Sequence, residues 1–306
     1  MTSNRLDALR GKRIAVIGDV MLDRYLIGVA ERLSPEAPVP VVRLTEERDV
    51  LGGAANVAAN LVALGATPLL VGVVGDDDTA EGVIFRLLWA ADIQNDWLLH
   101  ASITTTVKTR IVAQGQQMVR VDREEVAPYS EALERWVRDT ALEAIASADA
   151  VVCADYDKGV LSKSVIAAIR STVGARPWVV DPKTRLSRYR GATVLKPNRK
   201  EVSAAVTPGH DATLRDICGV EYLLVTEGAG GMTLVDASGS QHFPAKAREV
   251  FDVAGAGDTV TAWLAAGLAA GFPMVEAVDW ANRAAGIVVG KRGVATVTPE
   301  EVLDAR

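Results

Sequence analysis

Short apolar segments that end in glycine or in a polar residue recur along much of the chain. Residues 13–18 (RIAVIG) and 69–75 (LLVGVVG) have this form, and residues 150–154 and 178–181 repeat it. Continuous apolar runs of this length are typical of parallel strands that are buried on both faces. Between them lie amphipathic helical patterns, for example at residues 130–148, so strand, loop and helix alternate. This alternation predicts an α/β fold around a mostly parallel sheet.

Polar residues follow several of these strands, at the edge where parallel sheets bind ligands. Asp19 and Asp23 come after the first strand, in the place of the glycine-rich turn of a dinucleotide-binding enzyme. Carboxylates accept hydrogen bonds from sugar hydroxyls, so these two favour a polyol ligand, although both could instead be turn-capping acids. Residues 181–183 (DPK) and 196–198 (KPN) follow two later strands and are expected at the same edge.

Residues 252–259 (DVAGAGDT) lead into an apolar helix and carry the clearest chemical signal. Glycines permit a tight turn, and the free N–H groups at a helix start suit a phosphate or a developing phosphoryl charge. We expect the amides of Gly255, Ala256 and Gly257 to bind that charge. A carboxylate beside a phosphate is unexpected, because the two negative charges repel each other. We therefore infer that Asp258 has a chemical role and takes the proton from a hydroxyl that attacks phosphorus. The alternative is a plain loop with Asp258 as the N-cap of a core helix.

Two segments predict strands outside the main sheet. Residues 25–49 include the proline-rich stretch SPEAPVPV without a helical period, which indicates either a β flap or an irregular surface segment. Residues 104–123 alternate around a Gln-Gly-Gln turn and predict a β-hairpin that completes the flap. Such a flap can close on a substrate and exclude water. The charged side chains of the hairpin face either a substrate or solvent: Lys108, Arg110, Arg120 and Asp122.

Three further stretches are candidates for ligand contact. Gly52 and Gly53 open an Ala-rich helical segment with Asn56 one turn away, which is either a close backbone approach to a ligand or an ordinary helix start. Asn198 and Glu201 are spaced as in a capping box. Residues 222–231 (YLLVTEGAGG) predict a strand and a glycine-rich turn with no helix after it, which excludes the dinucleotide fingerprint.

Composition narrows the class of protein. The 306 residues are 49% hydrophobic and 24% charged, enough for a large core in one α/β domain or two smaller ones. A net charge of -6 argues against a nucleic-acid or anionic-membrane surface, so phosphate binding must be local. The two cysteines and three histidines lack metal-ligand spacing, and the cysteines suit core packing in a reducing compartment. With no apolar run long enough to cross a bilayer, we expect a cytoplasmic protein.

Two of these stretches, residues 51–65 and 252–259, resemble the paired signatures of the ribokinase-like (PfkB) carbohydrate kinases. The usual second signature is Asp-Thr-x-Gly-Ala-Gly-Asp, and Val253 replaces its Thr here. The resemblance covers essentially the whole chain. It implies a three-layer α/β/α kinase domain over residues 1–306, with a small β-sheet lid formed by segments at about 23–50 and 103–123.

The resemblance also implies roles for particular residues. Gly52, Gly53 and Asn56 would line the sugar pocket. An Asn-x-x-Glu element, here Asn198 and Glu201, orders magnesium-bound water and the nucleotide phosphates in this family, as an alternative to a simple helix cap. Residues expected beside the nucleotide are Lys196, Thr226, Gly228, Gly231 and, near the adenine, Asn282. The implied cofactors are ATP and Mg²⁺, with a monovalent cation as a further candidate.

Within the family, the stretches GDVMLDRY, SPEAPVPV, LGGAANVA and DVAGAGDTV look like those of kinases that act on D-glycero-β-D-manno-heptose 7-phosphate in lipopolysaccharide synthesis. This implies ATP-dependent phosphorylation of the anomeric hydroxyl, on the route to ADP-heptose, and a homodimer formed through the β lids. The sugar phosphate needs a cationic partner, which we expect among Lys108, Arg110, Arg120, Lys183 and Arg185.

Some kinases of this type are fused to a C-terminal nucleotidylyltransferase. Because this chain stops at Arg306, we expect that second activity to reside elsewhere. Two alternatives remain open: a kinase of another sugar or sugar phosphate, such as fructose or ribose, and a nucleotide- or sugar-binding regulator on the same scaffold.

Overall fold

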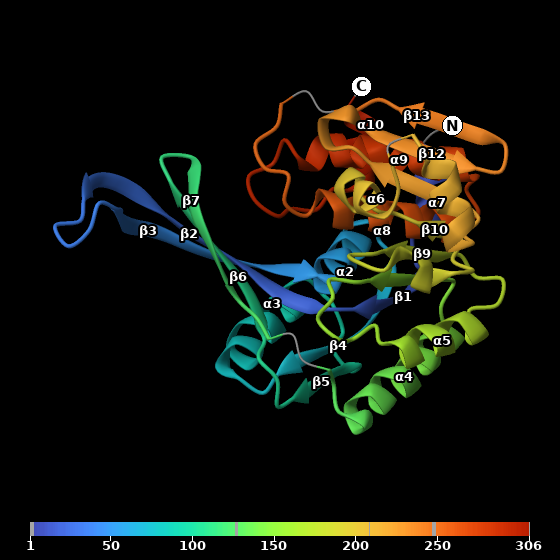
Figure 1. The fold of residues 1–306 in the computed structure, drawn as a ribbon, viewed down its shortest axis with the longest axis horizontal. Helices are drawn as coiled ribbons and strands as arrows, with labels where there is room; N and C mark the ends of the chain where they lie inside the picture. The colour runs from blue at the N-terminus through green and yellow to red at the C-terminus, as the bar shows by residue number, and fades with distance from the viewer. Residues whose placement is uncertain (1–2, 126–127, 208, 247–248, 306) are drawn as a thin grey trace.

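The computed structural model describes residues 3–125, 128–207, 209–246 and 249–305, and a large twisted sheet forms the centre of its main body (Figure 1). The order of its nine strands is β13-β12-β11-β10-β9-β8-β1-β4-β5. In chain order they are β1 (Arg13–Gly18), β4 (Thr67–Gly75), β5 (Leu98–Ala101), β8 (Ala150–Ala154), β9 (Trp178–Asp181), β10 (Val194–Leu195), β11 (Tyr222–Thr226), β12 (Met232–Asp236) and β13 (Gly239–Phe243). All neighbours from β11 to β5 pair in parallel, and only the pairs β11–β12 and β12–β13 are antiparallel. The predicted mostly parallel sheet is confirmed.

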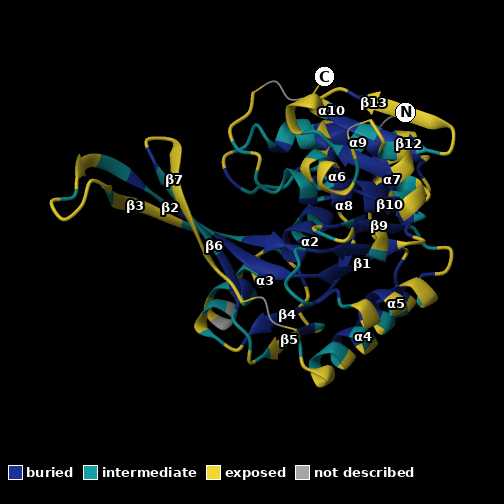
Figure 2. Ribbon diagram, in the orientation of Figure 1, coloured by how far each residue is buried: buried dark blue, intermediate teal, exposed yellow. Residues whose placement is uncertain are grey.

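Helices cover both faces of this sheet, because successive strand residues point to opposite sides. Ile14 and Val16 of β1 belong to a core with α2, α8 and α9, whereas Ala15 and Ile17 belong to a core with α4 and α5. The helices of the first layer are α2 (Ala54–Ala63), α3 (Phe85–Ala90), α8 (Ala256–Ala269), α9 (Met274–Val288) and α10 (Pro299–Asp304). Those of the second layer are α4 (Glu131–Ala146), α5 (Lys163–Thr172), α6 (Arg199–Ala205) and α7 (Asp211–Cys218). Figure 2 shows the buried residues concentrated on the sheet between them. The expected three-layer α/β/α fold is therefore confirmed.

A second sheet forms an arm that projects from this body (Figure 1). Its strand order is β3-β2-β6-β7. The strands are β2 (Val20–Leu33), β3 (Pro40–Gly53), β6 (Thr106–Ala113) and β7 (Gln116–Arg123). β2 and β3 form a long hairpin around the proline-rich stretch, and β6 and β7 form the hairpin expected from residues 104–123. Most residues toward the tip of the arm are exposed (Figure 2).

One local expectation needs correction. Gly52 and Gly53 end β3, and α2 begins only at Ala54, because the backbone N–H of Ala54 donates to the carbonyl of Asp19 and ties the strand end to β1. A π-helical turn, η2 (Ala80–Ile84), directly precedes α3.

The remaining short elements are α1 (Ser3–Leu6), η1 (Asp7–Leu9), η3 (Leu186–Tyr189) and η4 (Gly228–Gly230). Cys153 and Cys218 are free and buried, as core packing requires. In the part of the chain that the structure describes, no helix combines the length and apolarity needed to cross a membrane.

Candidate active site

The carboxyl ends of four adjacent strands, β1, β8, β9 and β10, bring polar side chains to one edge of the sheet. Asp19 follows β1, Asp155 and Tyr156 follow β8, Asp181 ends β9, and Lys196 follows β10. All but Tyr156 and Asp181 are buried, although each is polar. Buried polar groups require partners, so their contacts define the chemistry of this edge.

The turn before α8 reaches this edge through Gly255. Its φ of 79° lies in the left-handed region, and a Cβ there would lie 2.8 Å from Nδ2 of Asn56. Both observations require glycine. Asp252 supports the turn, because its Oδ1 accepts a hydrogen bond from the N–H of Ala254 at 2.9 Å. Gly255 is the N-cap of α8 and Asp258 is its third residue, so the alternative that made Asp258 the N-cap is wrong.

Asp258 is buried, and side chains of two other elements fix its carboxylate. Nδ2 of Asn56, on α2, donates to its Oδ2 at 2.7 Å, and the hydroxyl of Tyr156 donates to its Oδ1. Asn56 is itself oriented by Asn60, whose Nδ2 donates to the Asn56 carbonyl at 2.9 Å. The hydroxyl of Thr259 completes the network by donating to Oδ1 of Asn60 at 2.9 Å. The carboxylate is thus held by a connected buried network.

The pKa of Asp258 is raised to about 7, mainly by burial and also by the charge of the nearby Asp181 carboxylate. Hydrogen bonds from Tyr156 and Asn56 and the charge of Lys196 oppose the rise. The buried Lys196 forms an ion pair with the partly buried Asp181, with 2.9 Å between Nζ and Oδ2. A carboxyl group that titrates near neutral pH is suited to general base catalysis.

A cavity of about 530 Å³ opens beside the start of α8. Ala256 and Gly257 line it, together with Tyr156 and Asp181. All residues that the resemblance placed beside a nucleotide also line it: Lys196, Asn198, Glu201, Thr226, Gly228, Gly231 and Asn282. Apolar residues such as Val260 and Val289 form another part of its wall, so it offers both a polar end and a surface for a flat apolar group.

Asn198 and Glu201 form a capping box at the start of α6. Oδ1 of Asn198 accepts from the N–H of Glu201 at 3.0 Å, and Oε2 of Glu201 accepts from the N–H of Asn198 at 2.8 Å. Lys183, predicted among the residues that bind the sugar phosphate, lines this cavity, and its Nζ lies 3.4 Å from Oε1 of Glu201. Within the described residues, no group of three or more His, Cys, Asp or Glu side chains is arranged to hold a metal ion directly.

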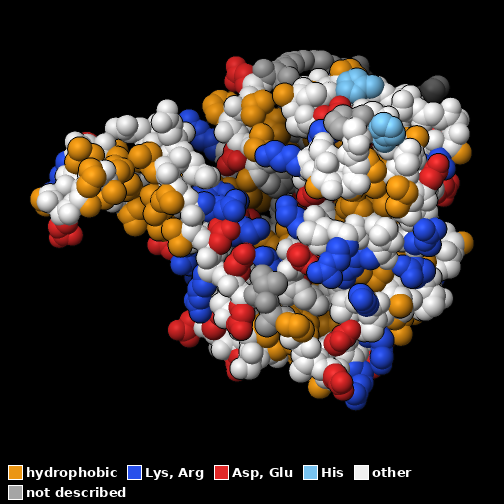
Figure 3. Space-filling model, in the orientation of Figure 1, with side chains coloured by type: hydrophobic (Ala, Val, Ile, Leu, Met, Phe, Trp, Pro, Cys, Tyr) orange, Lys and Arg blue, Asp and Glu red, His pale blue; other side chains and the backbone are white. Residues whose placement is uncertain are grey.

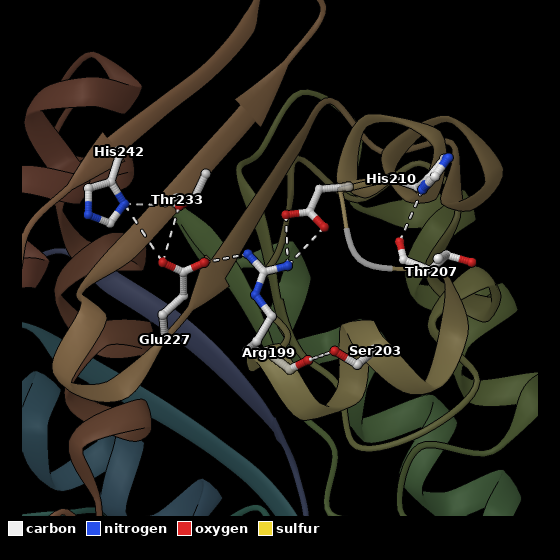
Figure 4. A network of polar contacts seen from close by, with 8 residues as sticks. Arg199, Ser203, Thr207, His210, Glu227, Thr233 and His242 are labelled. Atoms are coloured by element: carbon white, nitrogen blue, oxygen red, sulfur yellow. Dashed lines mark hydrogen bonds and ion pairs between the residues drawn. The ribbon is translucent and has the colours of Figure 1, made fainter.

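An ionic network links α6 to the glycine-rich turn after β11 (Figure 4). Arg199 forms an ion pair with Glu227 and another, at 2.9 Å, with Asp211. Glu227 also accepts a hydrogen bond from Thr233 and lies 3.7 Å from His242. The backbone joins the same segments, because the N–H of Thr226 donates to the carbonyl of Pro197 at 3.0 Å. One arginine therefore fixes the two segments that line the cavity.

The carboxylate of Asp19 mainly binds the backbone of the loop after β8. It accepts from the backbone N–H groups of Tyr156, Lys158 and Val160 at 2.8, 3.1 and 3.2 Å. Burial raises the pKa of Asp19 to about 6, helped by the charge of Asp155 and opposed by these hydrogen bonds. The polyol contact predicted for Asp19 therefore has to share the carboxylate with three backbone donors.

The charges at the base of the arm fall into three groups. Asp23 forms an ion pair with Arg110 on the neighbouring strand, and a Cβ at Gly52 would lie 2.5 Å from its Oδ2. Lys108 lies over the ring of Tyr156, 5.4 Å from its centroid, and burial lowers the pKa of this lysine. Arg120 and Asp122 pair with each other at 2.8 Å on the edge strand β7, opposite Arg110 and Lys108. Arg185 lies away from the arm and lines a separate cavity behind α6.

Sequence reasoning missed Tyr156 and Asn60. Residues 181–183 and 196–198 are selected because polar residues that directly follow a parallel strand lie at the ligand-binding edge. The same rule selects Tyr156, because residues 155–158 (DYDK) follow β8 at that edge. Asn60 carries no such signal, since it lies in the middle of an apolar helix. Only the fold brings it to Thr259.

Comparison with known proteins gives consistent results. The family described as pfkB family carbohydrate kinase matches residues 12–301. The chain is 46% identical to the bifunctional protein HldE of Pelobacter propionicus over 97% of its length, and 44% identical to that of Paramagnetospirillum magneticum over 98%. In both cases it spans 64% of the relative's length.

Solved structures show the same fold at lower identity. A putative ribokinase from Agrobacterium tumefaciens superimposes with a TM-score of 0.80 at 23% identity, covering 96% of this chain and 97% of that one. Arabidopsis thaliana ribokinase, complexed with ribose and ATP, gives 0.74 at 18% identity, covering 97% and 98%. With residues 12–301 matched by the family pattern and its curated relatives above 40% identity, the chain belongs to the pfkB family of carbohydrate kinases.

Proposed function

We propose that this kinase transfers the γ-phosphoryl group of ATP to the anomeric hydroxyl of D-glycero-β-D-manno-heptose 7-phosphate. The product is the 1,7-bisphosphate, on the route to ADP-heptose for lipopolysaccharide, and the reaction takes place in the cytoplasm. The observation that carries the kinase chemistry is the buried Asp258 carboxylate at the start of α8, beside a cavity lined by Ala256 and Gly257. The heptose substrate is supported by identities of 41–46% to proteins named HldE.

In this proposal one kinase domain, with the arm as its lid, holds both substrates. ATP occupies the cavity of about 530 Å³, and the sugar lies on the other side of Tyr156, near Asp19, Asp23 and the strand end at Gly52 and Gly53. Asp258 takes the proton of the anomeric hydroxyl as its oxygen attacks the γ-phosphorus. The bond from that phosphorus to the β–γ bridging oxygen breaks, and ADP leaves with the bond's electron pair. The amides of Gly255, Ala256 and Gly257 face the charge that develops on the transferred group.

Mg²⁺ fits the donors at the polar end of the cavity. The side-chain groups of Asn198 and Glu201 there supply oxygen atoms, which this ion prefers, and both oxygens of Glu201 keep acceptor capacity beyond the capping box. We assign these two residues to the ion through bound water. The ion would neutralise charge on the nucleotide phosphates.

We assign the grip on the sugar's distal phosphate to Lys108. It is half-buried, and among the described residues no carboxylate lies within ion-pair distance of its ammonium. Besides burial, the charges of Lys158 and Arg120 lower its pKa, whereas Asp23 and Asp122 raise it. An anion between Lys108 and Lys158 would offset both the burial and the like charge.

The Lys108→Met variant tests this assignment. Loss of a charge-assisted hydrogen bond to phosphate should raise KM for heptose 7-phosphate by about 10- to 100-fold and leave KM for ATP unchanged. Arg120→Met is the matched control, since Arg120 is exposed and paired with Asp122. An equal effect of both substitutions would contradict the assignment.

The function itself is tested by measuring ADP release with MgATP and mannose, fructose 6-phosphate or D-glycero-D-manno-heptose 7-phosphate. We expect a strong preference for the heptose phosphate. If only fructose 6-phosphate or an unphosphorylated sugar is turned over, the assignment as a sugar kinase stands and the heptose substrate is excluded. No turnover with any sugar, together with binding of ATP, would favour a regulator.

We also propose that two copies associate through their lids. Large exposed hydrophobic side chains gather on the arm (Figure 3). They are Leu33, Val39, Leu44, Met118, Val119 and Val121. A second copy of the arm would cover such a surface. Light scattering should show a dimer for the wild type and a monomer for Val119→Lys combined with Val121→Lys, and a monomeric wild type would refute the proposal.

A further inference from the structure

At the edge of the sheet, the hydroxyl of Tyr156 donates a hydrogen bond directly to the carboxylate of the candidate base, Asp258. We propose that Tyr156 is a positioning residue that holds the Asp258 carboxylate in its reactive orientation and links it to the arm through Lys108. This inference rests on the proposed kinase function and adds a residue that neither the family signatures nor the sequence reasoning contain.

The first argument is geometric. The two oxygens of Asp258 are held from different elements, Oδ2 by Asn56 of α2 and Oδ1 by Tyr156 after β8. Two donors on two oxygens prevent the carboxylate from rotating about its Cβ–Cγ bond. Each oxygen retains a further lone pair, so the group still accepts a proton from the substrate hydroxyl.

The second argument concerns the position of Tyr156 itself. Its backbone N–H donates to Asp19 at 2.8 Å, so the strand end at β1 fixes its main chain. Its ring lies under the ammonium of Lys108 on β6, and the residue lines the nucleotide cavity. One side chain therefore contacts the arm, the nucleotide cavity and the base. Movement of the arm relative to the body would therefore displace the ring of Tyr156 and, through its hydroxyl, the carboxylate of Asp258.

The third argument is electrostatic. The groups that face Asp258 are Asp181 from β9, Lys196 after β10, the neutral amide of Asn56 and the hydroxyl of Tyr156. Burial and Asp181 raise the pKa of Asp258, whereas Tyr156, Asn56 and Lys196 lower it. Tyr156 stays protonated, because burial and the charges of Asp258, Asp181 and Asp23 raise its own pKa. It therefore acts as a donor that favours the ionised base, and the substrate proton ends on Asp258.

The test compares Tyr156→Phe, which keeps the ring over which Lys108 lies and removes only the hydroxyl, with the wild type. Loss of a hydrogen bond to a charged group should lower kcat by about 10- to 100-fold. The KM values for ATP and sugar should change little. The acid limb of kcat/KM should move to higher pH by about one unit, because a donor to the carboxylate is gone.

Tyr189→Phe is the matched control. Tyr189 is also buried and also donates its hydroxyl to a carboxylate, that of Asp155, but it does not contact Asp258. Its loss should affect thermal stability without moving the acid limb. A wild-type pH profile and kcat in Tyr156→Phe, or an equal shift in both variants, would overturn the inference.

A second measurement does not depend on turnover. The carboxyl ¹³C signal of Asp258, assigned by its absence in Asp258→Asn, reports the pKa of that group directly. We expect a higher pKa in Tyr156→Phe than in the wild type. An unchanged pKa would refute the role of Tyr156, whereas a raised pKa in a protein that phosphorylates no sugar would refute only the proposed function.

Discussion

Replacement of Gly255 by alanine tests whether the turn before α8 holds the catalytic network in place. A left-handed conformation costs a residue with a Cβ about 1–2 kcal/mol, and φ is 79° here. The added Cβ would also lie 2.8 Å from Nδ2 of Asn56 and 3.2 Å from Cγ1 of Val294. Relief of such crowding costs about 1–3 kcal/mol in a packed site. We therefore expect Gly255→Ala to lower the free energy of unfolding by about 2–5 kcal/mol.

The Gly271→Ala variant separates the conformational cost of the left-handed backbone from the steric cost of the added Cβ. Gly271 has a φ of 77°, but no atom lies within 4 Å of its would-be Cβ. This variant should lose only the conformational cost of about 1–2 kcal/mol. Urea denaturation gives both values, provided that the m-value is unchanged. Gly255→Ala should also lower kcat, because Asn56 must move away from Asp258, whereas Gly271→Ala should not. Equal destabilisation of the two variants and normal turnover in both would refute the reasoning.

Three further results are expected. The folded protein keeps a proton on Asp258 between pH 3.8 and about 7 that the unfolded chain releases, so the free energy of unfolding should fall as pH rises through this window. A shift of about three pH units corresponds to about 4 kcal/mol of unfolding free energy. Urea titrations at several pH values should therefore show a shallower decline of that free energy with pH for Asp258→Asn than for the wild type. Parallel pH curves for the two proteins would contradict the pKa shift. Asp181→Asn should move the acid limb of kcat/KM to lower pH, because the charge of Asp181 raises the pKa of Asp258; a shift to higher pH would be inconsistent with this. Arg199→Lys should raise KM for ATP several-fold with a smaller effect on kcat, since lysine cannot bridge Asp211 and Glu227 as arginine does; a fall in kcat alone would argue against the network's role at the nucleotide.

The main sheet could be predicted from sequence because its strands are buried on both faces. Residues 13–18, 150–154 and 178–181 are mostly apolar runs, and each coincides with an observed strand. The end of β3 could not be predicted, because Gly52 and Gly53 precede a helix and look like its start. They belong to the strand because β3 pairs with β2 as far as Gly53, a contact between residues far apart in sequence.

The candidate site was predictable where one segment supplies the whole signal. Residues 255–258 contain both the glycine turn and the carboxylate, and residues 198–201 contain both halves of the capping box. The partners of Asp258 come from α2 and from the loop after β8, about two hundred and one hundred residues away along the chain. Sequence spacing carries no information about such contacts. For the same reason, sequence could assign Lys183 to the site but could not predict the cavity that it lines or its contact with Glu201.

The most direct test of the account is the identity of the product. The purified protein is incubated with MgATP and D-glycero-β-D-manno-heptose 7-phosphate, and the product is analysed by ³¹P and ¹H NMR. The account predicts a second phosphate whose phosphorus couples to the anomeric proton, formed by the wild type and slowed by about 10²- to 10⁴-fold in Asp258→Asn. A phosphate on any other carbon, or near-normal turnover by Asp258→Asn, would contradict it.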